Sequence, residues 1–486
     1  MGHLVGKDLY RELGGKLDRL PCRAPWNETL REILKGLYTE GEADLLVRMP
    51  TSAATAGAIA AGVKLPEARV RGLLEGMAFK GLVVDLVMKG ESYYMPSPMV
   101  IGFFEFTMMR AGAPASGSGT PGSEGAGPAA VDVRKMARLF HDYMEDGGPF
   151  YPANFGNGEK VSAMRALPHE GTVAPEHAME VLDYEKASAI ASSAGRAAFG
   201  ACACRHKARH LGSEPRPADA VPEGGRDARP PAWTAPCSAP EGVCTSFGYA
   251  ADFLIRRGLA REAELSEVQD SLARSRDQGL VLNADNVQRG VTFICHCCKC
   301  CCLALRGIST HGYPNAVVTS NFIARVDAEA CTGCGKCVEA CPISALRAIP
   351  EAVSDGRARG PAATGRAGRP LPRVEVDAEI CLGCGVCGVA CPVAACRLAP
   401  RPSRVLHPET TFRKIILISL ERGTLQHQLF SDPGSMTQEF LAGLLGGFLG
   451  LAPVKRALMS ETLRSVFLKS LESAVRAKGQ GWAAEL

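Results

Sequence analysis

The sequence predicts an α+β protein of several domains, and three observations support this fold class. The chain has 486 residues, which is more than one hydrophobic core usually accommodates. Apart from Cys22, its 20 cysteines all lie between Cys202 and Cys396. Three stretches rich in Gly, Pro, Ala and Ser have the composition of linkers or solvated insertions: 112–130, about 212–236, and 354–372.

Residues 1–110 are predicted to form a winged-helix-like domain. "NETLREILKGLY" offers Asn27 as an N-cap before apolar residues at helical spacing. "TAGAIAAG" reads as a short second helix, and a third opens at Pro66. "LVVDLVMKGESYYM" then reads as a hairpin that turns at Lys89-Gly90. Many proteins place this combination of elements in the major groove of DNA.

The charge of this region does not favour DNA binding. It carries 14 Lys and Arg against 13 Asp and Glu, whereas a domain that reads phosphates should be distinctly basic. On the third helix, Arg69 and Arg71 are offset by Glu67 and Glu75. A docking or structural role is therefore preferred to DNA recognition.

Residues 132–322 follow a predicted flexible linker at 111–131 and are expected to form a mainly helical, cysteine-rich metal or iron–sulfur domain. The run from Phe247 to Gly290 reads as helices, with Ser266 as an N-cap. Ten cysteines here are candidate metal ligands: Cys202, Cys204, Cys237, Cys244, Cys295, Cys297, Cys298, Cys300, Cys301 and Cys302.

Six of these cysteines lie within "FICHCCKCCC", residues 293–302. Because "VTFI" predicts that the chain enters this stretch in an extended conformation, alternate side chains should face opposite ways. The two predicted sets are Cys295, Cys297 and Cys301 on one face, and Cys298, Cys300 and Cys302 on the other. One four-ligand metal cannot use both faces, so we expect either two centres completed by upstream cysteines or one cluster with spare thiols.

Iron–sulfur is preferred to zinc in this domain, and an unmetallated thiol-redox role is the third alternative. The ligand pairs of zinc sites are usually separated by two to four residues, and adjacent Cys-Cys pairs suit that geometry poorly. His296 and His206 could be ligands, but such histidines more often donate hydrogen bonds that tune a cluster, as Arg205 would.

The strongest signal is an internal repeat that begins at Val326 and again at Val376, and each copy contains C-x2-C-x2-C-x3-C-P. Three thiolates two residues apart can hold three corners of a [4Fe–4S] cube, while Gly335 and Gly385 permit the tight turns. The fourth cysteine leads into a helix that points away, so we expect it to serve the cluster of the other repeat. Cys396 and Cys22 read as structural residues.

Residues 323–400 resemble bacterial two-cluster ferredoxins, from which the insertion at 351–372 departs. The resemblance implies two [4Fe–4S] clusters. One would bind Cys331, Cys334, Cys337 and Cys391; the other would bind Cys381, Cys384, Cys387 and Cys341.

The whole chain is similar to ferredoxin-type iron–sulfur proteins of anaerobic bacteria. These join a winged-helix-like N-terminus to a C-x-C-R…C-H-C-C-x-C-C-C domain and a two-cluster module. "GLVLNADNVQRGVTFICHCC" contributes to the likeness. The resemblance implies electron transfer with an unidentified redox partner protein, and it implies no particular reaction.

Composition and the ends of the chain complete the prediction. The net charge is only +4, the first 20 residues lack the apolar core of a signal peptide, and 401–486 reads as helical. The uncharged stretch Phe440 to Val454 is too short and glycine-rich to span a bilayer. We therefore expect a cytoplasmic, multi-cluster electron carrier or electron-transfer subunit. The alternatives are a redox-responsive transcription regulator and a small-molecule oxidoreductase, although the chain has no nucleotide loop or flavin fingerprint.

Overall fold

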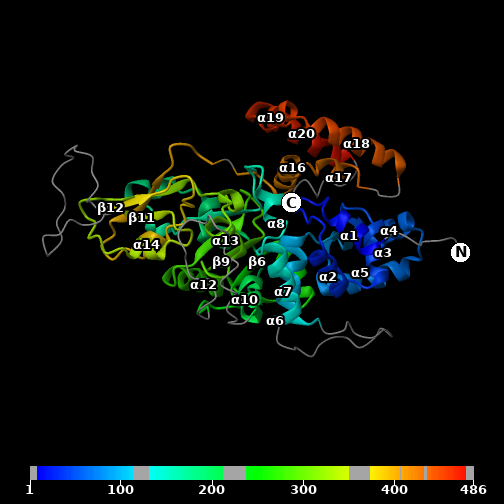
Figure 1. The fold of residues 1–486 in the computed structure, drawn as a ribbon, viewed down its shortest axis with the longest axis horizontal. Coiled ribbons are helices and arrows are strands. Elements are labelled where there is room, and N and C mark those ends of the chain that lie inside the picture. Colours follow the sequence, from blue (N-terminus) through cyan, green and yellow to red (C-terminus); the bar gives the residue numbers. More distant parts are fainter. Residues whose placement is uncertain are drawn as a thin grey trace.

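The computed structural model describes residues 8–112, 131–211, 237–349, 373–405, 407–431 and 435–477. Apart from the first and last residues of the linker at 111–131, the predicted linkers and the insertion lie outside this description. Figure 1 shows an elongated molecule with the N-terminal helices at one end and the cysteine repeats at the other. The C-terminal helices run along one side of the N-terminal half.

The N-terminal region contains helices and a small three-stranded sheet of order β1-β3-β2. Asn27 caps the second helix by accepting a hydrogen bond from the backbone N–H of Leu30 at 2.8 Å, as predicted. The hairpin turns at Lys89 and Gly90, which have φ angles of 53° and 82°, again as predicted. The elements are α1 (Leu9–Leu17), α2 (Glu28–Leu37), α3 (Glu40–Arg48), β1 (Ala54–Thr55), α4 (Ala56–Val63), α5 (Glu67–Lys80), β2 (Val83–Met88), β3 (Glu91–Pro96) and α6 (Phe104–Gly112).

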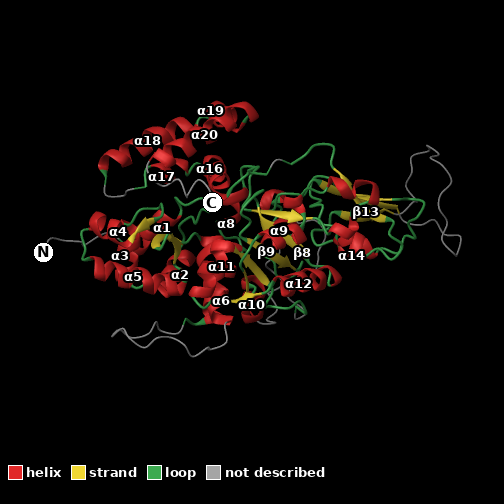
Figure 2. Ribbon diagram, turned by 180° about the vertical axis from the view of Figure 1, so that it is seen from behind, coloured by secondary structure: helices red, strands yellow, loops and turns green. Residues whose placement is uncertain are grey.

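The middle region is built around a six-stranded antiparallel sheet of order β4-β8-β9-β6-β5-β7 (Figure 2), so the expectation of a mainly helical domain was wrong. The strands are β4 (Met164–Leu167), β5 (Ala197–Gly200), β6 (Cys244–Phe247), β7 (Ala260–Ala263), β8 (Val281–Asp285) and β9 (Phe293–Cys297). The helices are α7 (Val133–Met144), α8 (Phe150–Phe155), α9 (Ala187–Ser193), α10 (Ala203–Leu211), α11 (Gly248–Arg256), α12 (Leu265–Asp277) and α13 (Leu303–Ser309).

Short strands with helix-forming residues caused this error. The sequence of β7 is Ala-Arg-Glu-Ala, and its pairing with β5 overrides that helical preference. The helix that follows starts two residues earlier than expected. Glu264, not Ser266, is its N-cap, and it forms a capping box with Glu267.

The two faces of this sheet have different coverings. Phe247, Leu282 and Ile294 lie in a hydrophobic cluster with residues of α9 and α12. Side chains alternate along a strand, so residues an odd number of positions away face the opposite side of the sheet. These residues include Cys244, Asn283, Cys295 and Cys297. The sheet thus presents three thiols on a single face, the face opposite α9 and α12.

The two cysteine repeats interlock through their strands. β10 (Phe322–Val326) pairs with β13 (Cys396–Pro400), and β11 (Leu346–Ile349) pairs with β12 (Arg373–Val376). The first strand of the first repeat therefore pairs with the last strand of the second. Two short helices, α14 (Lys336–Ala340) and α15 (Val386–Val389), follow the cysteine loops.

The C-terminal region is helical over its described residues. It contains α16 (Thr411–Arg422), α17 (Leu425–Leu429), α18 (Met436–Gly450), α19 (Ala452–Met459) and α20 (Glu461–Ala477). In the described part of the chain, no single helix has both the length and the apolar composition needed to cross a bilayer; α18 and α19 meet these criteria only as a pair, bent by 80°.

Candidate metal centres

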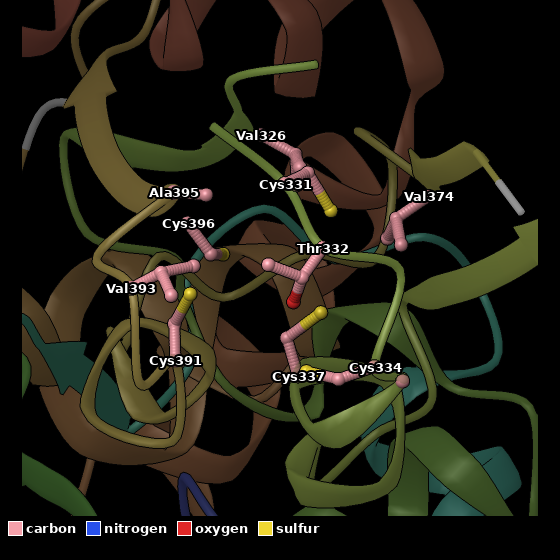
Figure 3. A pocket seen from close by; sticks show the side chains of 11 residues that line it. Val326, Cys331, Thr332, Cys334, Cys337, Val374, Cys391, Val393, Ala395 and Cys396 are labelled. Carbon is pink, nitrogen blue, oxygen red and sulfur yellow. The ribbon is translucent and has the colours of Figure 1, made fainter. Parts of the chain in front are cut away.

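Two cavities lie within the cysteine repeats. In Figure 3, Cys331, Cys337 and Cys391 direct their sulfur atoms toward the same space. The first cavity is lined by four predicted ligands, Cys331, Cys334, Cys337 and Cys391. The second is lined by the other four, Cys341, Cys381, Cys384 and Cys387. Each cavity therefore combines one three-cysteine loop with the Cys-Pro cysteine of the other repeat.

The interlocked strands explain this exchange. The N–H of Asp327 donates to the carbonyl of Ala395 at 2.9 Å, and the N–H of Asp377 donates to that of Ala345 at 2.7 Å. These equivalent contacts hold the start of each repeat against the end of the other. Cys396 belongs to the same strand junction, where it is 2% exposed and lines the wall of the first cavity.

Glycines let the cysteine loops turn tightly. Gly335 and Gly385 have φ angles of 74° and 82°, in the left-handed region that other residues avoid. The second loop also has no room for a side chain, because a Cβ at Gly385 would lie 2.2 Å from the hydroxyl oxygen of Thr172. This loop therefore packs directly against the middle region.

The two cavities differ in their access to solvent. Cys334 of the first is exposed, and a hydrogen bond from the backbone of Lys336 lowers its pKa. Cys384 of the second is buried, and burial raises the pKa of its thiol. The first cavity is thus the outer one and the second the inner one.

Four cysteines of the middle region form a compact group, called here the four-thiol site: Cys237, Cys298, Cys300 and Cys301. Their sulfur atoms all lie within 4.8 Å of one another. The sulfur atoms of Cys237 and Cys298 are 3.6 Å apart. This is the number and kind of ligand that a zinc ion or an iron–sulfur cubane requires.

The remaining six cysteines form a second group, called here the six-thiol ring: Cys202, Cys244, Cys295, Cys297, Cys302 and Cys204, in order around it. The thiol of Cys295 lies beside those of Cys244 and Cys297. That of Cys302 lies beside those of Cys297 and Cys204. Cys202 interacts electrostatically with both Cys204 and Cys244, and so belongs to the same group.

The predicted alternation of cysteines holds within β9 and fails beyond it. Cys295 and Cys297 share a face as expected, but the chain turns at residues 299–301. Cys301 therefore joins Cys298 instead of Cys297, and Cys302 joins Cys297 instead of Cys298. The extended geometry was wrong there because the strand ends at Cys297.

The two histidines that the sequence suggested as ligands or tuning groups have other partners. His296 faces α12 and is hydrogen-bonded to the hydroxyls of Thr245 at 3.0 Å and Ser275 at 2.6 Å. Burial lowers the pKa of His296 to about 3, so its ring is neutral. His206 is hydrogen-bonded to the carbonyl of Met108 and to His210. Both rings are thus structural.

Arg205 occupies the position between the two thiol groups. Its guanidinium interacts with Cys202 of the six-thiol ring and with Cys298 of the four-thiol site. It is 2% exposed and donates to the carbonyls of Pro240 and His296, which leaves its Nε without a hydrogen-bond partner among the described residues. A buried cation here favours anionic groups on both sides.

Two residues outside the predicted ligand set connect the four-thiol site to the repeats. Lys299 donates from its ammonium group to the carbonyl of Glu339 in α14, at 3.0 Å. The backbone N–H of His169 donates to the carbonyl of Cys384 at 3.0 Å, and its ring Nε2 donates to that of Leu280 at 2.8 Å. Leu280 packs with Cys298 and the other thiols of the site. No sequence motif marks His169.

Comparison with known families supports the iron–sulfur interpretation of the repeats. Residues 325–395 match the family model of the 4Fe-4S dicluster domain. No curated protein and no solved structure matches the chain. The domain match and the clustered cysteines show that this chain is an iron–sulfur protein with a general role in electron transfer.

Proposed function

We propose that this protein is a multi-cluster electron carrier or the electron-transfer subunit of a redox complex, acting in the reducing cytoplasm of an anaerobe. The observation that carries this proposal is the pair of cavities, each lined by four cysteines contributed by both repeats. Each set would hold one [4Fe–4S] cluster, which supplies one-electron redox chemistry when bound. The protein's own residues fix the ligands, exclude water and set the order of the centres.

The difference in burial supports a direction for electron flow. The outer cavity, with its exposed Cys334, is the one that a redox partner protein can approach. The inner cavity faces the middle region through the loop around Cys384. We therefore assign exchange with the partner to the outer cluster and internal transfer to the inner cluster.

The four-thiol site is proposed as the next centre of the relay. His169 joins the backbone of Cys384 to that of Leu280, which packs against Cys298 and Cys301. Lys299, within the site, donates to Glu339 in α14, the helix that contains Cys337 and leads to Cys341. These contacts make the site the neighbour of the inner cluster. Iron–sulfur suits it better than zinc, because Cys300 and Cys301 are adjacent in the chain.

Metal analysis tests this assignment. In anaerobically purified protein, the double variant Cys237→Ala/Cys300→Ala should lose about four irons and four sulfides per chain and keep the two ferredoxin-type signals. Cys22→Ala, which removes a cysteine outside the two cavities, the four-thiol site and the six-thiol ring, should lose none. Stoichiometric zinc in the wild-type protein, released by the double variant without loss of iron, would contradict the assignment.

The N-terminal region is proposed as a winged-helix-like docking domain. Its order α3-β1-α4-α5-β2-β3 supports that description. The wing is held against the middle region, because Asp85 of β2 pairs with Arg256 and with Arg257, the latter at 2.8 Å. On α5, Arg71 is paired with Glu67 at 2.5 Å. Both features reduce the positive charge free to meet phosphates.

Accordingly, the full-length protein should not bind its own promoter region tightly in either redox state at physiological salt. The affinity of phosphate-driven binding falls with roughly the first power of the salt concentration for each phosphate contact. This region has few cations that could make such contacts. The measurement is an anaerobic footprint across a salt series. A nanomolar, redox-dependent footprint that weakens in Arg69→Ala/Arg71→Ala would favour the transcription regulator instead.

A further inference from the structure

We propose that the six-thiol ring holds an iron–sulfur cluster of its own, separate from the four-thiol site, and that Asn283 hydrogen-bonds to it. The inference goes beyond the proposed electron-transfer role, because it depends on the middle sheet and not on the ferredoxin-like repeats. It would make the protein a carrier of four metal centres.

The first argument is how the ring is built. Three of its thiols come from one face of the sheet, on β6 and β9. Two more flank the start of α10, and Cys302 is the N-cap residue of α13. Three chain segments that are far apart in the sequence thus come together. The pairing of Thr245 with Ile294 places Cys244 next to Cys295 across β6 and β9, and Cys302 interacts with both Cys297 and Cys204. A set of spare thiols would not need this convergence.

The second argument is a buried amide without ordinary partners. Asn283 on β8 is fully buried, and neither its Oδ1 nor its Nδ2 has a hydrogen-bond partner among the described residues. Leaving such a group unsatisfied in the interior destabilises the fold. Its register partner across the sheet is Cys295, and its side chain reaches the thiol of Cys297. The amide N–H is therefore positioned to donate to sulfur at the ring.

The third argument is charge. A cluster bound by thiolates is anionic, and the ring is flanked by buried cations on two sides. Arg205 lies next to Cys202, and the ammonium of Lys207 interacts with Cys204. The nine-residue helix α10 also points its N-terminus at Cys202 and Cys204. These groups would stabilise a negative charge that six protonated thiols do not carry.

The surroundings of the ring favour iron–sulfur over other occupants. A zinc ion and a [4Fe–4S] cluster each take four thiolates, so the number of cysteines does not distinguish them. The buried cations and the amide of Asn283 suit an anionic cluster that accepts hydrogen bonds at its sulfur atoms. Disulfides are not favoured in a reducing compartment. A cluster can take its ligands from the ring and accept the hydrogen bond from Asn283, an interaction that stabilises the reduced state and raises the reduction potential.

The test begins with the wild-type protein. Anaerobic preparations should contain about sixteen irons per chain, four for each of four clusters. The double variant Cys244→Ala/Cys295→Ala should lose about four irons, and the loss should add to that of Cys237→Ala/Cys300→Ala. Twelve irons in the wild type, or losses that do not add, would overturn the second centre. Zinc in its place would overturn the iron–sulfur assignment. Retention of both ferredoxin-type signals separates this result from failure of the proposed electron-transfer role.

A second variant keeps the proposal testable if the cysteine variants do not fold. Asn283→Leu preserves shape and removes the donor, so the iron content should stay unchanged while one cluster shifts to a lower reduction potential. The control is Ser271→Ala, which removes a buried hydroxyl that also lacks a partner but lies on α12, behind the sheet. Redox titration followed by electron paramagnetic resonance gives the readout. Unchanged potentials in Asn283→Leu would overturn the assigned hydrogen bond.

Discussion

Replacing Cys341 by alanine should damage the cluster of the second cysteine loop and leave the cluster of its own loop intact. The reason is geometric, because Cys341 lines the same cavity as Cys381, Cys384 and Cys387. The strand pairing of Leu346 with Val376 holds it there. Loss of one of four thiolate ligands should remove up to about four irons or convert the cluster, and the change should be visible by electron paramagnetic resonance of the reduced protein.

The reciprocal variants provide the control. The spectrum of Cys341→Ala should coincide with that of Cys381→Ala, and the spectrum of Cys391→Ala with that of Cys331→Ala, because each pair lines one cavity. A match between Cys341→Ala and Cys331→Ala would mean that each repeat holds its own cluster. That result would contradict the exchange of ligands between the repeats.

Local signals in the sequence predicted several elements well. Asn27 caps its helix and Lys89-Gly90 turns its hairpin because each depends only on residues a few positions away. The positive φ angles of Gly335 and Gly385 belong to the same class of local requirement. In these cases the signal lies in the residue itself or in neighbours within a few positions of it.

The middle region could not be predicted in this way. Its strands have four or five residues, and β7 has a helix-forming sequence, so only pairing with β5 decides its conformation. The division of the ten cysteines follows from the turn after Cys297 and from the return of residues 202 and 237 to the same area. The proposed role of Asn283 likewise depends on the sheet, because strand pairing places this residue opposite Cys295.

A group of buried, ion-paired side chains, one of which interacts with Cys204 of the six-thiol ring, joins three helices. Glu145, which follows α7, pairs with Lys207 of α10 and with Arg306 of α13, the latter at 2.6 Å. The side chains of Glu145 and Lys207 are fully buried. Burial alone would raise the pKa of Glu145, but Lys207, His141 and Arg306 lower it well below 4.5. The carboxylate therefore balances two cations, of which Lys207 interacts with Cys204 of the six-thiol ring.

Glu145→Gln should lower the free energy of unfolding by about 3–5 kcal/mol, because it leaves the buried ammonium of Lys207 without a counter-charge. Glu67→Gln, which breaks an exposed pair with Arg71, should lower the free energy of unfolding far less, because water screens the pair. Urea unfolding of anaerobic, cluster-loaded protein measures both. Since the folded pKa of Glu145 lies below its unfolded value, its contribution is complete at neutral pH and is lost only as the pH falls through the folded pKa. The difference in the free energy of unfolding between wild type and Glu145→Gln should therefore be constant from about pH 6 to 8. If this difference were no larger than that of Glu67→Gln, the buried charges would not hold the three helices together.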